Sequence, residues 1–349
     1  MIGIALLTLV PGELGGSESA TGGLLHALAD DGTLPYRVYL PPVAPGAAEG
    51  LPSELVPEYR PAHTIPERLL AMSWAAARPG PLRRRLAAAD VVHYPLTIRI
   101  PTITTPSVIT LHDLQHLDLP MLFSRGERAF RAAFWHRSVR SAQLIVTPSA
   151  FVRDRAVALL GIDGARIRVI PHGIDHARFS PSGENREPFL LYPARRWPHK
   201  NHERLFDAFA LLRRERPELQ LVLTGGGHSG GAPQGVDVRG HVSLDELVSL
   251  YRRASALVFP SLYEGFGQPV LEAMACGCPV ACSAIPALAE VAGDAARTFA
   301  PGDPESISAA VSDVLAEPGR YRERGLEHAG QFTWKRAASQ YESVYRELL

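Results

Sequence analysis

Short apolar runs alternate with helical patterns along almost the whole chain of 349 residues, and this alternation constrains the fold strongly. The runs are rich in Val, Ile and Leu, as expected of strands that are buried on both faces. Helical patterns such as residues 202–214 and 244–253 lie between them. The sequence therefore predicts an α/β protein whose parallel sheets carry helices on both faces. The expected strands are residues 2–10, 91–94, 107–111, 144–147, 189–193, 219–224, 256–259 and 280–283.

A break in the middle of the alternation predicts two doubly wound domains rather than one barrel. The break is the polar segment FSPSGENREP at 179–188, which has a linker composition. We expect an N-terminal domain over 1–180, a C-terminal domain over 186–331 and a final segment over 332–349. The helical pattern of that last segment begins at Trp334, after Thr333 as a candidate N-cap.

Composition indicates an ordinary soluble globular protein. Hydrophobic residues make up 46% of the chain and charged residues 21%. Basic and acidic side chains number 36 each, and this balance argues against a dedicated nucleic-acid binder. Cys276, Cys278 and Cys282 are odd in number and clustered, so we expect small buried thiols rather than a disulfide framework. A metal site would need a fourth ligand.

The first residues, MIGIALLTLVPGELGG, have no basic region and no small-residue cleavage site, so they predict a strand and not a signal peptide. No apolar stretch reaches about 18 residues. We therefore expect a cytoplasmic protein.

One stretch of the N-terminal half is basic. From Arg60 to Arg99 there are seven Arg against two acids, Glu67 and Asp90. The stretch also contains Trp74, so it could touch an anionic membrane surface or a charged acceptor. A solvated helix face is the alternative, because prolines 79 and 81 interrupt any long amphipathic helix.

The segment SLYEGFGQP at 261–269 lies between an expected strand and an expected helix. Gly265 and Gly267 allow the backbone to approach a ligand closely, and the following helix N-terminus attracts anions. Glu264 and Glu272 are eight positions apart, which places Glu272 about one turn into that helix. An acid there suits ribose hydroxyls, although a plain strand–turn–helix connection has the same spacing.

A second segment, ARRWPHKNH at 194–202, follows another expected strand. Arg195 and Lys200 are cations that could neutralise a diphosphate, and Lys200 is one of only two lysines in the chain. Surface charges before a helix capped by Asn201 are the alternative.

Gly225, Gly227 and Gly230 spell the G-x-G-x-x-G dinucleotide fingerprint after a strand. The context is wrong, because no helix opens there and the next one begins near Ser243, with Glu246 completing a capping box. We interpret this loop as a wall of a ligand site rather than a nicotinamide site.

In the N-terminal half, Gly15 and Gly16 follow the first strand, and His112 and Asp113 end another. A His beside an Asp could act in acid–base chemistry or bind sugar hydroxyls. The chain has no D-x-D pair of the kind that holds a divalent metal on a diphosphate.

Together and in this order, these elements resemble the retaining glycosyltransferases of the GT-B fold, specifically family 4. The resemblance extends over nearly the whole chain, and Ala194 departs from it where the family usually has glycine. The segment PHKN at 198–201 resembles the corresponding segment of a family branch associated with mannosyl or rhamnosyl transfer. The matching segments are E-x7-E from Glu264 to Glu272, R-x4-K from Arg195 to Lys200, PSAF at 148–151 and PHGID at 171–175.

The resemblance implies two Rossmann-like domains that face a central cleft, with a nucleotide-sugar donor bound mainly by the second domain and an acceptor mainly by the first. It also implies that the last helix returns to the first domain. The resemblance further implies a role for each site residue. The donor diphosphate would be bound by Arg195, Lys200, Gly15 and Gly16, and the nucleotide side by Gly225, Gly226, His241 and Val242. The ribose would be bound by Glu272, the donor sugar by Gly265, Phe266 and Gly267, and the reacting sugar by His112 and Glu264.

The expected function is transfer, with retention and without metal or cofactor, of a mannose- or rhamnose-like hexose from a nucleotide diphosphate sugar. The acceptor would be a hydroxyl of a glycan, a lipid-linked saccharide or a metabolite. Two alternatives stay open, a sugar-nucleotide epimerase or hydrolase of the same fold and a non-catalytic sugar-nucleotide-binding subunit. A pyridoxal phosphate phosphorylase would need Lys200 or Lys335 as its Schiff base.

Overall fold

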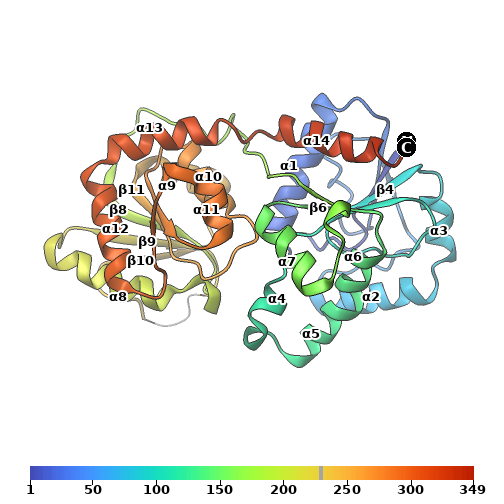
Figure 1. The fold of residues 1–349 in the computed structure, drawn as a ribbon, viewed down its shortest axis with the longest axis horizontal. Helices are drawn as coiled ribbons and strands as arrows, with labels where there is room; N and C mark the ends of the chain where they lie inside the picture. Colours follow the sequence, from blue (N-terminus) through green and yellow to red (C-terminus); the bar gives the residue numbers. More distant parts are fainter. Residues whose placement is uncertain (228–230) are drawn as a thin grey trace. The chain divides into compact units, whose positions relative to one another are not determined.

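The computed structural model describes residues 1–227 and 231–349. The chain forms two compact units, Met1–Gly173 with Trp334–Leu349 and Ile174–Thr333. Each unit contains one parallel sheet with helices on both faces (Figure 1). The predicted α/β fold with two doubly wound sheets is confirmed. The boundary at Gly173 precedes the polar segment 179–188, which lies inside the second unit, where Phe179 joins the core.

The first unit has a seven-stranded sheet of order β3-β2-β1-β4-β5-β6-β7, in which all neighbours are parallel. Its strands are β1 (Ile2–Ala5), β2 (Tyr36–Leu40), β3 (Ser53–Leu55), β4 (Val91–Tyr94), β5 (Ser107–Thr110), β6 (Leu144–Thr147) and β7 (Ile167–Val169). Its helices are α1 (Gly16–Asp31), α2 (Ile65–Ala77), α3 (Gly80–Leu86), α4 (Gln115–Asp118), α5 (Arg125–Arg131), α6 (Arg137–Ser141), α7 (Ala150–Leu160) and α14 (Trp334–Arg346), and a π-helical turn, η2 (Ala132–His136), joins α5 to α6.

The second unit has a six-stranded parallel sheet of order β10-β9-β8-β11-β12-β13. Its strands are β8 (Glu187–Pro193), β9 (Gln220–Thr224), β10 (Val236–Gly240), β11 (Ala254–Phe259), β12 (Val280–Ser283) and β13 (Arg297–Phe299). Its helices are α8 (His202–Glu215), α9 (Leu244–Arg253), α10 (Gln268–Ala275), α11 (Pro286–Ala292), α12 (Pro304–Ala316) and α13 (Pro318–Ala329).

Both sheets reverse their strand order at one point, between β1 and β4 in the first unit and between β8 and β11 in the second. At such a switch point the loops at the carboxyl ends of the two strands diverge to opposite faces, which leaves room for a ligand. The loops after β1, β8 and β11, which carry Gly15, Lys200 and Glu264, lie at these two points. His112 follows β5, and Gly225 and His241 follow β9 and β10.

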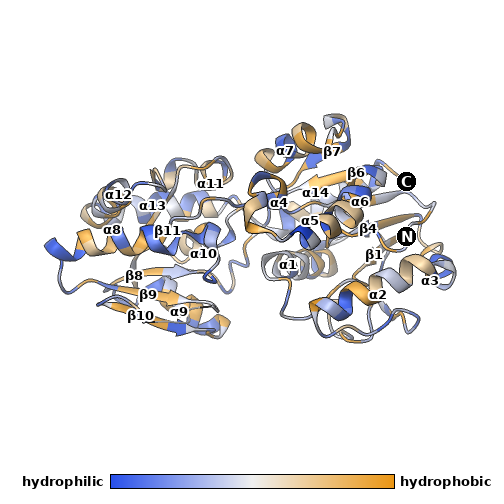
Figure 2. Cartoon of the chain, turned by 90° about the horizontal axis from the view of Figure 1, so that it is seen from below, coloured by the Kyte–Doolittle hydropathy of each residue, from blue (hydrophilic) through white to orange (hydrophobic). Residues whose placement is uncertain are grey.

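The two sheets are buried between amphipathic helices. In Figure 2, β1 and β4 have hydrophobic colour, whereas α8 alternates between hydrophobic and hydrophilic turns. The buried stripe of α8 includes Leu205, Phe209 and Leu212 at helical spacing, as expected of a helix with one face on a sheet.

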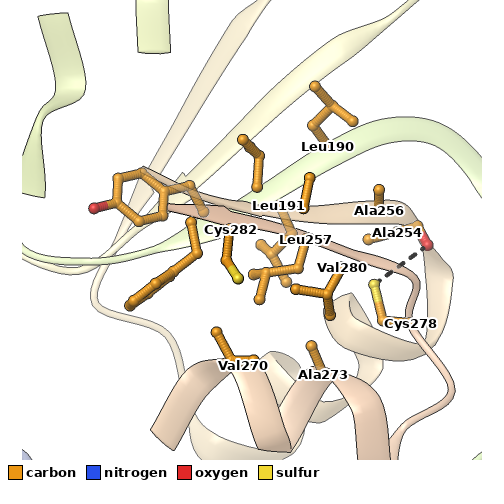
Figure 3. Packing of buried hydrophobic residues seen from close by; sticks show 14 of the residues in the cluster. Leu190, Leu191, Ala254, Ala256, Leu257, Val270, Ala273, Cys278, Val280 and Cys282 are labelled. Atoms are coloured by element: carbon orange, nitrogen blue, oxygen red, sulfur yellow. Dashed lines mark hydrogen bonds between the residues drawn. The ribbon is translucent and has the colours of Figure 1, made fainter. Parts of the chain in front are cut away.

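The three cysteines lie in the core of the second unit. Figure 3 shows Cys278 and Cys282 among buried residues of β8, β11 and β12, and Cys278 Sγ contacts the carbonyl of Ala254 at 3.8 Å. Burial raises the pKa of Cys278 to about 11 and that of Cys276 to about 12. These thiols are neutral packing groups at neutral pH.

The last helix, α14, packs beside α1 in the first unit (Figure 1). The Glu342 carboxylate anchors it, because it accepts hydrogen bonds from Tyr36 Oη at 2.6 Å and from the backbone of Thr33 and Leu34. Burial alone would raise the pKa of Glu342, but the hydrogen bonds from Tyr36 and Thr33 outweigh it and lower the pKa to about 2. No helix in the described residues is long and apolar enough to cross a membrane.

Candidate active site

Lys200 and Glu264 meet at the carboxyl edge of the second sheet. Lys200 ends a short 3-10 turn after β8, and Glu264 lies in the loop after β11. Lys200 Nζ lies 2.6 Å from Glu264 Oε1, and the side chains are only 15% and 14% exposed. The ring of Phe259 lies 5.4 Å from the same ammonium. The switch point therefore holds a shielded ion pair.

The two loops are tied together by hydrogen bonds. Leu262 N donates to His199 O at 2.7 Å, and Tyr192 Oη donates to Lys200 O at 2.6 Å. Asn201 adopts a left-handed conformation with φ 60°, and its side-chain amide donates to the carbonyls of Pro260 and Pro301. These contacts fix the backbone on both sides of Lys200.

Arg195 follows β8 by two residues. Its guanidinium lies over the Trp197 ring at 5.8 Å and makes no hydrogen bond or ion pair with any described residue. The neighbouring Arg196 differs, because it pairs with Glu203 at 2.6 Å. Arg195 is therefore a half-buried cation whose charge is available to a ligand.

The glycine-containing turn after Glu264 leads directly into α10. Gly267 has φ 113°, which favours glycine, and a Cβ there would lie 2.4 Å from Leu288 Cδ2. The buried Phe266 ring packs 6.4 Å from the Phe332 ring. The turn is thus held rigidly, with the first amides of α10 behind it.

Glu272 lies on α10 and accepts a hydrogen bond from Tyr251 Oη, on α9, at 2.9 Å. Burial raises the pKa of Glu272 to about 7, against the Tyr251 hydrogen bond, which lowers it. The carboxylate therefore changes charge near neutral pH. Its hydrogen-bond partner is Tyr251, and within the described residues it makes no ion pair with Lys200 or Arg195.

The loops after β8, β9 and β10 converge. Gly225 has φ 99°, and a Cβ there would lie 2.8 Å from the Ala194 carbonyl carbon. A Cβ at Gly226 would lie 2.8 Å from His241 Nε2. Residues 228–230, which complete the G-x-G-x-x-G pattern, lie outside the described residues. The described chain continues at Gly231 and enters β10 at Val236, so a strand and not a helix comes next. Val242 lies next to His241 in the turn before α9 and is half-buried.

In the first unit, Gly15 has φ 57° and precedes α1, which begins at Gly16. A Cβ on either glycine would meet nothing within 4 Å. The Glu18 carboxylate holds this loop by accepting hydrogen bonds from Gly12 N at 3.0 and 3.1 Å.

His112 follows β5. Its Nε2 lies 2.8 Å from Pro95 O, after the neighbouring strand β4. Because a carbonyl can only accept, Nε2 carries the hydrogen and Nδ1 carries the lone pair. Burial lowers the pKa of His112, against the Pro95 hydrogen bond and Asp113, which raise it. Its ring contacts that of His172 at 5.8 Å, and His172 stacks on Trp334 at 5.9 Å.

The structure thus brings together Lys200 with Glu264, and Gly226 with His241, but it pairs Glu272 with a residue that the sequence did not single out. Tyr251 is a supporting residue that sequence reasoning missed. Tyr251 could have been found from the helical pattern 244–253, because it follows Val248 by three positions and so lies on the same buried face. Sequence reasoning treats Asn201 only as a helix cap, but its side chain makes no cap hydrogen bond and instead donates to Pro260 and Pro301.

Two parallel Rossmann-like sheets, with cations and acids at the switch point of the second, are the features expected of a GT-B glycosyltransferase. Comparison with known proteins gives the family. Residues 174–330 match the model of glycosyl transferases group 1, and residues 14–178 match that of glycosyltransferase family 4.

The chain belongs to the family 4 glycosyltransferases. It is 31% identical over 288 residues to O-antigen chain mannosyltransferase B of Escherichia coli, covering 74% of this chain and 75% of the relative. It is 28% identical to MMP alpha-(1->4)-mannosyltransferase of Mycolicibacterium hassiacum over 80% of this chain and 78% of that protein. Sucrose-phosphate synthase of Thermosynechococcus elongatus has the same fold, with a TM-score of 0.78 at 20% identity over 99% of this chain and 98% of that one.

Proposed function

We propose that this glycosyltransferase moves a mannose-like hexose from a nucleotide diphosphate sugar to an acceptor hydroxyl with retention of configuration. The observation that carries the proposal is the shielded Lys200–Glu264 ion pair at the β8–β11 switch point, together with the unpaired guanidinium of Arg195 in the loop after β8. The names of the relatives, two of which are mannosyltransferases, support the choice of sugar.

The cations act on the diphosphate. Glu264 accepts one of the three ammonium hydrogens of Lys200, so two others remain for phosphate oxygens. The planar guanidinium of Arg195 can donate two parallel hydrogen bonds to a second pair of phosphate oxygens. Both cations stabilise the negative charge that grows on the leaving diphosphate, and their fixed positions avoid reorganisation during the reaction.

Two further residues orient the donor. The Glu272 carboxylate accepts from ribose hydroxyls, with Tyr251 holding it in place. His112 Nδ1 carries a lone pair, because Pro95 holds the Nε2 hydrogen, and it accepts from a hydroxyl of the transferred sugar. The backbone of Gly265–Gly267 contacts the sugar from the second unit, and Gly15 and Gly16 allow the first loop to approach the donor.

The transfer step needs no protein nucleophile. The bond between the anomeric carbon and the diphosphate oxygen breaks, and the acceptor oxygen bonds to that carbon on the same face. The acceptor proton passes to the departing diphosphate oxygen. In this proposal the protein contributes positioning and charge stabilisation, and no metal ion takes part.

A donor panel with product analysis tests the proposal. The chain is incubated with UDP-, GDP- and dTDP-sugars, including GDP-mannose, in the presence of EDTA and saccharide acceptors. We expect an acceptor-dependent glycoside with the donor's anomeric configuration, as read by NMR coupling. Acceptor-independent release or rearrangement of the sugar would favour the epimerase or hydrolase alternative. Donor binding without any turnover would favour a non-catalytic subunit.

The basic stretch from Arg60 to Arg99 supports a second, peripheral proposal, contact with an anionic membrane. On α2, Leu70 is 67% exposed, and the guanidinium groups of Arg60 and Arg78 lie 5.0 and 5.7 Å from the Trp74 ring. Vesicle co-sedimentation tests it. Binding to anionic vesicles that falls several-fold in Leu70→Ser supports membrane contact, and equal binding to neutral vesicles contradicts it.

A further inference from the structure

Arg68 is a buried charge without a partner. It lies on α2 and is only 8% exposed. Its Nε is fully buried and lacks a hydrogen bond, and the guanidinium makes no ion pair with any described residue. Burial lowers the pKa of Arg68 to about 10, which still leaves it charged at neutral pH. A buried charge of this kind is costly unless an anion compensates it.

A second guanidinium lies near the first. Arg131, the last residue of α5, is close enough to Arg68 to lower its pKa further. The Arg131 guanidinium lies over the rings of Trp135 at 4.2 Å and Phe123 at 4.7 Å, and it makes no hydrogen bond within the described residues. These rings fix its position without neutralising its charge.

Two acids lie in the surroundings of Arg131, but each is already engaged elsewhere. Asp113 accepts from Gln115 N at 3.0 Å, and Glu127 accepts from Ser124 N at 2.8 Å and Ser124 Oγ at 2.7 Å. Neither makes an ion pair with Arg131 within the described part of the chain. Burial lowers the pKa of Arg131 and both acids raise it electrostatically, whereas no carboxylate does so for Arg68. Arg68 is therefore the cation that lacks a compensating anion among the described residues.

Neutral polar groups with unused hydrogen-bonding capacity surround the two cations. Tyr59 Oη, Trp135 Nε1 and His116 Nδ1 are all buried and lack a hydrogen-bond partner among the described residues. Tyr59 belongs to the hydrophobic cluster against which Trp135 packs. Burial raises the pKa of Tyr59, and the positive charge of Arg68 acts to lower it. The His116 ring lies 5.7 Å from the Trp135 ring. Trp135 and His136 belong to the π-helical turn η2, a distortion that occurs often at functional sites.

We propose that Arg68 and Arg131, with Tyr59 and Trp135 as neutral donors, form a binding site for a phosphoryl group in the first unit. Two guanidinium groups suit a doubly charged tetrahedral anion. The anion's oxygens can accept hydrogen bonds from the planar guanidinium groups and, at the same time, from the O–H of Tyr59 and the N–H of Trp135. Resting on the proposed function, we assign the phosphoryl group to the acceptor, which makes the acceptor substrate a phosphorylated saccharide or lipid.

Thermal unfolding with inorganic phosphate tests the site. Wild-type protein is compared in phosphate and in chloride at equal ionic strength. We expect phosphate to raise the wild-type Tm by several degrees, because it binds the folded state only. No rise in phosphate would overturn the proposal.

Arg68→Met separates a ligand role from a structural one. Removing an uncompensated buried charge should raise the Tm in phosphate-free buffer, and it should weaken phosphate binding at least tenfold. Arg137→Met, at an exposed arginine on the adjoining helix α6, is the matched control and should keep the full phosphate response. A lower Tm of Arg68→Met in phosphate-free buffer, or an unchanged phosphate response, would overturn the proposal.

Further titrations identify the source of the phosphoryl group and keep the two proposals apart. Tighter binding of farnesyl phosphate than of inorganic phosphate indicates a lipid-linked acceptor, and tighter binding of mannose 1-phosphate indicates a soluble one. Arg68→Met should weaken the binding of both compounds.

The anion site and the proposed function can fail separately. The phosphate response should persist in Lys200→Ala, and GDP or UDP binding should persist in Arg68→Met. If the wild-type protein bound no nucleotide, the proposed function would be contradicted, whereas the proposed anion site would be unaffected.

Discussion

At the scale of single residues, the ionisation of Glu272 depends on its burial. Its pKa of about 7 lies above the ordinary value near 4.5, so between these pH values the folded chain holds a proton that the unfolded chain has lost. The contribution of Glu272 to the free energy of unfolding is therefore fully favourable below about pH 4.5 and falls as pH rises to about 7.

The same titration should control nucleotide affinity. A carboxylate accepts hydrogen bonds more strongly than a carboxylic acid, so the Kd for GDP or UDP should fall by roughly three- to tenfold between pH 6 and 8. Glu272→Gln should remove this part of the pH dependence while the titration of the nucleotide phosphate itself remains. Calorimetric titrations at several pH values make the comparison, and equal pH dependence in the two proteins would exclude Glu272 from the ribose site.

At the scale of elements, the close packing of α14 on α1 depends on a glycine. A Cβ at Gly23 would lie 2.3 Å from Trp334 Cε2, whereas one at Gly22 would have only Glu49 Oε1 nearby, at 3.8 Å. Gly23→Ala should therefore destabilise the first unit by about 1–3 kcal/mol. Gly22→Ala should stabilise it by up to about 1 kcal/mol through helix propensity.

Urea unfolding followed by tryptophan fluorescence measures both variants. The pair differs by one position on the same helix, so it separates the clash with Trp334 from any general effect of alanine in α1. Equal stabilities of the two variants would show that α14 does not pack on α1 as described.

Much of the element pattern could be predicted because parallel strands are continuous apolar runs. The strands Val91–Tyr94, Leu144–Thr147 and Val280–Ser283 have the predicted bounds, and every residue in them is buried. Five of the described strands were missed: the edge strands β3, β7, β10 and β13, and the interior strand β2. The residues of β3 and β10 are largely exposed and polar, so no apolar run marks them. In β2 the exposed Arg37 interrupts the apolar run, and β7 and β13 are only three residues long. The first run was predicted too long, since 6–10 form a buried loop and not a strand.

The candidate site was predicted less completely, for a different reason. Lys200 and Glu264 each stand out by their place after an apolar run, but their ion pair joins residues 64 positions apart, which local patterns do not reveal. The hydrogen bond from Tyr251 to Glu272 and the buried, unpaired guanidinium of Arg68 also arise only from tertiary packing.

At the scale of the whole molecule, the chain passes between its units twice, near 173 and near 333. These crossings are adjacent, because Ile174 N donates to Phe332 O at 3.0 Å and Ile174 forms a parallel bridge with Thr333. Each unit keeps its own core. Binding of the donor diphosphate is proposed mainly for the second unit, with Gly15 and Gly16 of the first unit contributing, and the acceptor is assigned to the first unit.

The most direct measurement is kcat/KM of Lys200→Ala with the donor and acceptor that the panel identifies. Lys335→Ala is the control, because that lysine is exposed and pairs with Asp31 in the first unit. Loss of one charge-assisted contact to the leaving diphosphate corresponds to roughly 3 kcal/mol, so kcat/KM should fall at least about a hundredfold while the control stays close to wild type. A fall of less than about threefold, in a variant shown by its Tm to be folded, would contradict the assignment of Lys200 to the diphosphate.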